Sequence, residues 1–277
     1  LEPTAAAWGI HRVVNEGMAA AARIHGIERG RDLRAYPLFA FGGAGPVHCW
    51  QVARILKVPR ILLPFGAGAM SAWGLLAAPL AFDFVRTVRA RLDHADWDAL
   101  NRRFTEMEDE GRELLGRAGV AADAARVSRI AEMRYVGQGH EVEAPMPGGR
   151  LSPASLPAIT AAFEEAYRAL YHRLPQGVPI EALNWRVTVS GPPPRLAFGS
   201  AGGAARPSAD VVKGTRRAWF AEAAGWVQTP VYDRYALGAG TIFEGPAIVE
   251  ERESTAVIGP GARCRVDDGL TIVVTMP

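Results

Sequence analysis

Residues 38–48, with the sequence LFAFGGAGPVH, constrain the fold of this chain more than any other stretch. The apolar run of Phe39, Ala40 and Phe41 is typical of a strand that is buried on both faces. The glycines that follow permit positive φ and close approach of a ligand, and Pro46 can begin a helix because the N–H that it lacks would be unpaired there. A helix N-terminus with free amides at the end of a strand favours a phosphate or nucleotide. A tight turn without a ligand is the alternative, and the pattern alone leaves both open.

A second unit of similar design follows directly. Residues 58–64 form another short apolar strand, and residues 65–71 form a glycine-rich loop in which Ser71 can cap a helix over residues 72–80. With a helix over residues 47–56 between the two strands, the order predicts a right-handed βαβ unit of a parallel sheet. Parallel strands end at the same sheet edge, so we expect the two glycine-rich turns to lie together and wall one crevice.

The candidate ligand-binding residues are the small residues of these two turns. They are Gly42, Gly43, Ala44, Gly45, Gly66, Gly68 and Ser71. His48 closes the first turn and is a candidate catalytic residue, whereas its neighbour Cys49 fits a small buried side chain better. A Rossmann-type NAD site is a weaker interpretation, because the G-x-G-x-x-G spacing is missing and no acidic residue ends the second strand at Pro64.

Two further candidate catalytic residues, Arg134 and Glu141, begin and end the stretch RYVGQGHE. A salt bridge between Arg134 and a carboxylate is the favoured alternative. Because of the glycines between them, the sequence does not determine whether the two side chains lie on the same face of the sheet. Ser254 and Thr255 fit turn chemistry better than a nucleophile, since the sequence contains no G-x-S-x-G elbow. Asp83 and the acidic run at residues 250–253 fit solvated or paired charges and lack the spacing of a metal site.

Composition excludes several classes of protein. The formal net charge of the 277 residues is +2 and the arginines are scattered, which gives no nucleic-acid signal. No apolar run is long enough to span a membrane, so no membrane partner is expected. Cys49 and Cys264 lie far apart without a C-x-x-C partner, which argues against a zinc cluster or a disulfide framework. A reducing cytoplasm fits this composition best.

Several motifs together resemble the hydantoinase A/5-oxoprolinase family, which includes ATP-dependent N-methylhydantoinases and the nucleotide-binding subunits of acetone and acetophenone carboxylases. The matching stretches are NEGM at residues 15–18, the first turn at 41–48, residues 64–74, RYVGQGHE at 134–141, EGPAIVE at 244–250, and Ser254 with Thr255. They cover nearly the whole chain in the family's order, so the resemblance is specific.

The resemblance implies an α/β fold, namely the second lobe of an actin/Hsp70-like ATPase core over residues 1–88, followed by a β-rich α+β accessory region over residues 89–277. The family's first phosphate-binding segment, an Asp-Gly-Gly-Thr type hairpin, is not found here, and the chain opens at Leu1 directly on a helix. We therefore expect the C-terminal portion of a longer subunit, with about half of the nucleotide site.

For function, the resemblance implies ATP with Mg²⁺, whose ligands would come mostly from the remaining half of the subunit. The family phosphorylates the oxygen of a carbonyl or enolate, and the activated substrate is a cyclic amide that is hydrolysed or a ketone that is carboxylated. A hydantoinase B-type subunit is the implied partner. The isolated chain is expected to be inactive. The alternative from another class is a non-catalytic, subunit-docking module whose glycine turns serve only packing.

Periodicity completes the predicted organisation. Residues 5–25 predict an amphipathic helix with Ile10, Val13, Val14, Gly17, Met18, Ala21 and Ile24 on its buried face. A second helix carries a seam of Trp97, Leu100, Phe104, Met107, Gly111 and Leu114, and is expected to pack on another helix or on the ATPase lobe rather than to dimerise. Strands are predicted at 130–135, 140–145 and 184–189, with a helix over 155–174 and a surface loop over 197–209.

The last sixty residues give short, closely spaced strands, which predict a small β-barrel or sandwich at about 215–277. Its expected core is Trp219, Phe220, Trp226, Val231, Ile242, Ile248, Val257, Ile258 and Ile272. We expect this region to pack against the helix at 155–174, because Leu156, Phe163 and Tyr167 need an apolar partner.

Overall fold

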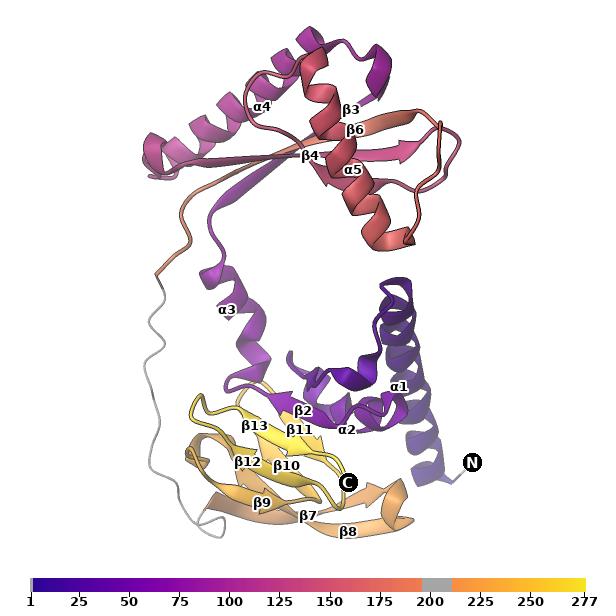
Figure 1. Cartoon of the computed structure of the whole chain (residues 1–277). Coiled ribbons are helices and arrows are strands. Elements are labelled where there is room, and N and C mark those ends of the chain that lie inside the picture. The colour runs from indigo at the N-terminus through magenta and orange to yellow at the C-terminus, as the bar shows by residue number, and fades with distance from the viewer. Residues whose placement is uncertain (1, 196–210) are drawn as a thin grey trace. The chain divides into compact units, whose positions relative to one another are not determined.

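The computed structural model describes residues 2–195 and 211–277, and the chain forms two compact units (Figure 1). The first unit combines Leu1–Leu76 with Leu196–Pro277, and the second is Ala77–Arg195. The chain therefore builds part of the first unit, then the second, and returns to complete the first. The loop predicted over 197–209 lies outside the described residues.

One sheet of the first unit joins the two ends of the chain. Its order is β1-β2-β13-β12-β9, where β1 is Leu38–Phe39, β2 is Arg60–Leu63, β13 is Ile272–Thr275, β12 is Arg263–Val266 and β9 is Ile242–Glu244. The predicted parallel pairing of the first two strands is confirmed, with Leu38 opposite Ile61. The far edge of β2 pairs antiparallel with β13, so the last strands extend the βαβ unit and share its core.

The strand before the first turn is not buried on both faces as predicted. Phe39 and Phe41 are each 47% exposed, while Ala40 between them is 5% exposed. The physical reason is position, because β1 is an edge strand two residues long whose only partner among the described residues is β2. An edge strand covers its side chains on fewer sides than an inner strand does.

The second sheet of the first unit contains most of the predicted C-terminal strands. Its order is β11-β10-β8-β7, with β7 at Val212–Phe220, β8 at Gly225–Asp233, β10 at Ala247–Glu250 and β11 at Thr255–Ile258. The prediction that Trp226 and Ile242 belong to the core is wrong, because these side chains are 52% and 65% exposed. Neighbouring residues in a strand face opposite sides, and in β9 it is Phe243, 4% exposed, that faces the core.

Three helices complete the first unit: α1 at Pro3–Glu28, α2 at Gly45–Leu56 and α3 at Met70–Ala77. The buried face predicted for α1 is wrong, since Ile10, Val13 and Ile24 are 58% to 70% exposed. Its buried residues are instead Asn15, Ala19 and Gly26. Small residues let α1 approach its neighbours closely, which bulky side chains at these positions would prevent.

The second unit is a four-stranded antiparallel sheet in the order β3-β6-β4-β5, with α4 and α5 packed on it (Figure 1). The strands are Ala81–Arg91, Ile180–Ser190, Arg126–Tyr135 and Val142–Pro145, and the helices are Trp97–Arg117 and Leu156–Tyr171. The predicted strand pair around residues 136–141 is confirmed as β4 and β5. Strand β3 was not predicted.

Both helices of the second unit find their apolar partner in their own sheet. Phe104 of α4 packs edge-on against Trp185 of β6, with ring centroids 5.9 Å apart. Phe163 of α5 packs edge-on against Tyr135 of β4 at 5.1 Å. The expectation that α4 packs on a helix or another lobe is therefore wrong, as is the expectation that α5 needs the C-terminal strands. Gly111 allows α4 to lie close, because a Cβ there would come within 2.7 Å of Val189 Cβ.

Short 3₁₀ turns connect these elements at Leu33–Ala35, Ala67–Ala69, Leu92–His94, Ala122–Ala124, Pro153–Ser155, Ala221–Ala223 and Arg234–Ala236. In the part of the chain that the structure describes, no helix has both the length and the apolar character needed to cross a membrane.

Candidate functional site

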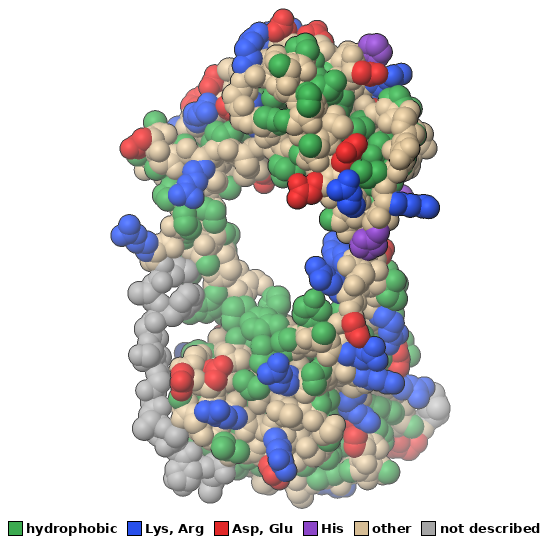
Figure 2. Space-filling model, viewed as in Figure 1, with side chains coloured by type: hydrophobic (Ala, Val, Ile, Leu, Met, Phe, Trp, Pro, Cys, Tyr) green, Lys and Arg blue, Asp and Glu red, His purple; other side chains and the backbone are tan. Residues whose placement is uncertain are grey.

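The two glycine-rich turns of the first unit lie against each other. The amide of Gly42 donates a hydrogen bond of 2.8 Å to the carbonyl of Ala67, which joins the first turn to the second. Gly42 and Gly66 have φ values of 85° and 71°, a left-handed conformation that favours glycine. Figure 2 shows apolar side chains gathered over this part of the unit.

The first turn exposes free backbone donors at the start of α2. Ala44 provides no side-chain cap, and Pro46 has no N–H. Among the described residues, no acceptor is recorded for the amides of Gly43, Ala44 and Gly45. These donors lie at the N-terminus of a twelve-residue helix, where the helix dipole also favours negative charge.

The remaining predicted turn residues differ in what they do. A Cβ on Gly68 would lie 2.6 Å from the carbonyl oxygen of Glu253, so packing of the chain itself requires glycine there. Gly45 has nothing within 4 Å of a Cβ position. The capping role predicted for Ser71 is wrong, because α3 begins at Met70 directly after a 3₁₀ turn and places Ser71 inside its first turn.

His48 is the third member of a hydrogen-bonded group with Asn15 and His11 of α1. His48 Nδ1 lies 2.9 Å from Asn15 Oδ1, and Asn15 Nδ2 lies 2.9 Å from His11 Nδ1. The two imidazole rings stack, with centroids 4.9 Å apart and an interplanar angle of 17°. Asn15 is 1% exposed. Two of the recognised motifs, NEGM and the first turn, thus meet at this residue.

The hydrogen bonds of Asn15 assign the imidazole tautomers. An amide oxygen only accepts and an amide nitrogen only donates, so His48 carries its proton on Nδ1 and His11 accepts on Nδ1. Burial, with a smaller contribution from His48, lowers the pKa of His11. No partner of His48 Nε2, on the first turn of α2, is recorded among the described residues.

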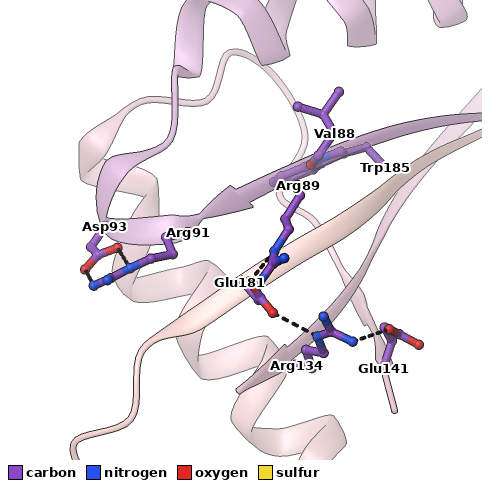
Figure 3. Close-up of polar contacts among 8 residues, drawn as sticks. All are labelled: Val88, Arg89, Arg91, Asp93, Arg134, Glu141, Glu181 and Trp185. Atoms are coloured by element: carbon purple, nitrogen blue, oxygen red, sulfur yellow. Dashed lines mark hydrogen bonds and ion pairs between the residues drawn. The ribbon is translucent and has the colours of Figure 1, made fainter. Parts of the chain in front are cut away.

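Arg134 and Glu141 of the second unit form an ion pair, as the favoured alternative predicted (Figure 3). Arg134 Nη1 lies 3.0 Å from Glu141 Oε1, and its Nε lies 2.9 Å from Glu181 Oε1. Glu181 Oε2 also accepts from Arg89 Nε at 2.7 Å. Glu181 is 2% exposed, and its hydrogen bonds from Arg89 and then Arg134 lower the pKa of its carboxyl. The group ties β3, β4 and β6 together.

The described residues offer no metal site, because no group of three or more His, Cys, Asp or Glu side chains converges among them. Burial raises the pKa of both Cys49 and Cys264 to about 12, so both remain thiols. Cys49 Sγ donates to the carbonyl of Pro46 at 3.1 Å, which agrees with the predicted small buried side chain.

The sequence predicts that Glu251 is a solvated or paired charge; it is paired with Arg234, but its contact with the second turn was not predicted. Its Oε1 accepts the amide of Gly66 at 3.0 Å. Ser254 Oγ, assigned to turn chemistry, donates to the carbonyl of Gly42 at 3.3 Å. Both contacts span more than 180 residues of sequence, and local patterns carry no signal for such contacts.

Comparisons with known proteins agree across the chain. Residues 1–84 match the family described as hydantoinase/oxoprolinase, and residues 89–273 match the hydantoinase/oxoprolinase C-terminal domain. The chain is 30% identical to caprolactamase subunit alpha of Pseudomonas jessenii over 98% of its own length and 39% of that protein. It is 29% identical to the acetophenone carboxylase gamma subunit of Aromatoleum aromaticum, over 99% of the chain and 38% of that protein.

The crystal structure of the ATP-dependent caprolactamase from Pseudomonas jessenii has a similar fold. The TM-score is 0.71 at 29% identity, and the match covers 98% of this chain and 40% of that one. The chain thus spans about two fifths of the length of these relatives.

Proposed function

The chain belongs to the hydantoinase/oxoprolinase family, and we propose that it is the C-terminal portion of an ATP-dependent subunit that activates a cyclic amide for hydrolysis. In this proposal residues 1–88 are the second lobe of an actin/Hsp70-like ATPase core, and residues 89–277 are the C-terminal region of the family. ATP use is supported by the likeness to a caprolactamase that is ATP-dependent.

One observation carries the nucleotide-binding part of the proposal. The amides of Gly43, Ala44 and Gly45 have no recorded acceptor and lie at the N-terminus of α2. Backbone donors at a helix N-terminus bind phosphate well, because they are fixed in direction and act with the helix dipole. His48 Nε2 adds an acceptor on the same turn, suited to a hydroxyl or amino group of the ligand.

The proposed chemistry overcomes the low reactivity of amides, in which resonance with nitrogen makes the carbonyl carbon a poor electrophile. Transfer of the γ-phosphoryl group of ATP to the carbonyl oxygen releases ADP and leaves a carbon that water can attack. The ring C–N bond then breaks and phosphate leaves. In this proposal the contribution of this chain is to hold the nucleotide.

Carboxylation of a ketone is the second candidate reaction, and the likeness to an acetophenone carboxylase subunit favours it. Both named relatives are described as subunits. We therefore propose a hydantoinase B-type partner in either case. Mg²⁺ is proposed to accompany ATP with ligands mostly from the rest of the subunit, since no group of three or more His, Cys, Asp or Glu side chains converges among the described residues; no step through the metal is assigned to this chain.

Nucleotide titration with backbone NMR tests the proposal. Adding ADP should shift the amide signals of Gly43, Ala44 and Gly45 before other signals. The variant Gly45→Val places a branched side chain beside these amides without positive φ or a clash, and it should lose the response.

Gly116→Val in α4 is the matched control, since its Cβ would also meet nothing within 4 Å. It should respond to ADP as the wild type does. Absence of any response in the wild type at millimolar ADP would contradict nucleotide binding at this turn. Stabilisation by a partner subunit without any nucleotide response would favour the docking module.

A further inference from the structure

The turn between β10 and β11, residues 251–254, lies against both glycine-rich turns. Its backbone closes with a hydrogen bond of 2.8 Å from the amide of Glu251 to the carbonyl of Ser254. We refer to these four residues as the β10–β11 tip. The tip brings one carboxylate, one hydroxyl and one backbone carbonyl to the two glycine turns.

The carboxylate of Glu251 holds the second turn. It accepts the amide of Gly66 at 3.0 Å, and Gly66 is the left-handed residue of that turn. The side chains of Glu251 and its ion-pair partner Arg234 are 6% and 2% exposed, with Arg234 Nε 3.4 Å from Glu251 Oε1. The amide of Gly66 therefore donates to a carboxyl group that a guanidinium also contacts.

Arg234 is itself fixed in place by two further contacts. Its Nη2 donates to the carbonyl of Leu270, and its guanidinium lies 5.2 Å from the ring centroid of Phe65, the residue before Gly66. Tyr235 packs edge-on against the same ring at 5.6 Å. Arg234 therefore contacts both Phe65 of the second turn and Glu251, and keeps Glu251 next to that turn.

The hydroxyl of Ser254 and the backbone of Glu253 hold the first turn. Ser254 Oγ donates to the carbonyl of Gly42 at 3.3 Å, and Ser254 is 8% exposed. The carbonyl oxygen of Glu253 lies 3.5 Å from a Cβ position on Gly43 and 2.6 Å from one on Gly68. Both turns therefore contact the β10–β11 tip, and we expect a change in the conformation of either turn to displace the tip.

We propose that the β10–β11 tip is a positioning element for the nucleotide site, in which Glu251 and Ser254 set the conformation of the two turns and Glu251 disfavours phosphate at the amide of Gly66. This inference rests on the proposed function. The amide of Gly66 is already occupied, and a fixed carboxylate behind it repels an anion at the second turn. The amides of Gly43, Ala44 and Gly45, for which no acceptor is recorded among the residues the structure describes, remain available to phosphate.

The first test measures the turns without nucleotide. Glu251→Gln keeps the shape of the side chain but removes its charge, so amide exchange at Gly66 should become at least about tenfold faster. Glu253→Gln changes the same charge on the same tip at an exposed side chain and is the control that should leave exchange at Gly66 unchanged. Unchanged exchange in Glu251→Gln would overturn the proposal.

Ser254→Ala is the second variant, because Glu251→Gln leaves Arg234 buried without its counter-ion and can fail to fold. It removes one hydroxyl and should shift the amide signals of Gly43 and Ala44, with little change in α4 or β6. Signals of the first turn that stay in place would overturn the role of Ser254.

The second test measures nucleotide affinity. Glu251→Gln should weaken binding of ADP by about tenfold, while Glu244→Gln, at an exposed side chain of β9 outside the tip, should bind as the wild type does. Normal affinity in Glu251→Gln, with altered turns, would overturn the positioning role and leave the proposed function intact. If the wild type binds no nucleotide, the proposed function fails, and the exchange experiment alone decides whether the tip sets the turns.

Discussion

The charged group around Arg134 in the second unit and the first glycine-rich turn of the first unit differ in how their polar groups are satisfied. In the second unit, Arg134 and Glu141 belong to a closed group in which the charges of four side chains cancel and each carboxylate has a guanidinium partner. In the first unit, three amides of the first turn have no recorded acceptor within the described ranges. Buried or directed polar groups without a protein partner are the ones that a ligand can satisfy. This difference supports the proposal that the first turn binds a ligand, and it gives the Arg134 group a structural role.

The largest expected effect is on the charged group of the second unit. Glu181→Ala removes the carboxylate between Arg89 and Arg134, and should lower the free energy of unfolding of this unit by about 3 kcal/mol. The value is below that of a fully buried pair because the side chain of Arg89 is 66% exposed. Hydrogen exchange of the β6 amides measures it. ADP-dependent shifts in the first turn should stay unchanged, and their loss would break the comparison.

The same carboxylate predicts a pH dependence. The folded-state pKa of Glu181 lies below its ordinary value of 4.5, so the unfolded chain binds more protons between the two values. The stability that the carboxylate contributes is therefore present above pH 4.5 and is lost as the pH falls through the folded-state pKa. The difference between wild type and Glu181→Gln in urea midpoint should shrink in acid. A difference that stays constant down to full protonation would contradict this role.

The next effect separates packing glycines from ligand-contacting glycines. Gly68→Ala places a Cβ 2.6 Å from the carbonyl oxygen of Glu253, and overpacking of this kind should cost about 2 kcal/mol of stability. Gly45→Ala, with nothing within 4 Å of the new Cβ, should leave stability nearly unchanged. Thermal unfolding of both variants tests this difference, and equal stability would show that the tip can move away.

Much of the fold was predictable because it follows from local pattern. The parallel strand pair, α2, α4, α5 and the strands of the last sixty residues come from periodicity and turn residues, which act over a few positions. Strand β3 was missed, although Phe82 and Phe84 alternate with Asp83 and Val85, because the prediction continued a helix through residue 80. The periodicity of α1 predicted that its apolar face is buried. The helix instead packs through Asn15 and Ala19, and that apolar face is exposed.

The site was predictable only in part. Glycines that need positive φ, such as Gly42, are visible as a pattern, but the reason for Gly68 lies in a carbonyl 185 positions further along the chain. The role of Glu251 also depends on distant residues. The sequence predicts a solvated or paired charge, and the fold buries its side chain to 6% exposure beside Arg234 and Gly66. Long-range contacts decide which polar groups are satisfied, and sequence pattern does not report them.

The smallest expected effect on stability belongs to Asn15, and it sharpens the comparison within the first unit. Asn15→Ala removes both hydrogen bonds that assign the tautomers of His11 and His48, at a cost of about 1 kcal/mol. The nitrogen chemical shifts of His48 should change from a pure Nδ1–H form to a mixture of tautomers. Asn15→Asp keeps an acceptor for His48 Nδ1 and should retain the form, while it loses the donor to His11. If the His48 tautomer is unchanged in Asn15→Ala, then Asn15 serves only to pack α1, and the polar groups of the first unit would resemble the closed structural set of the second.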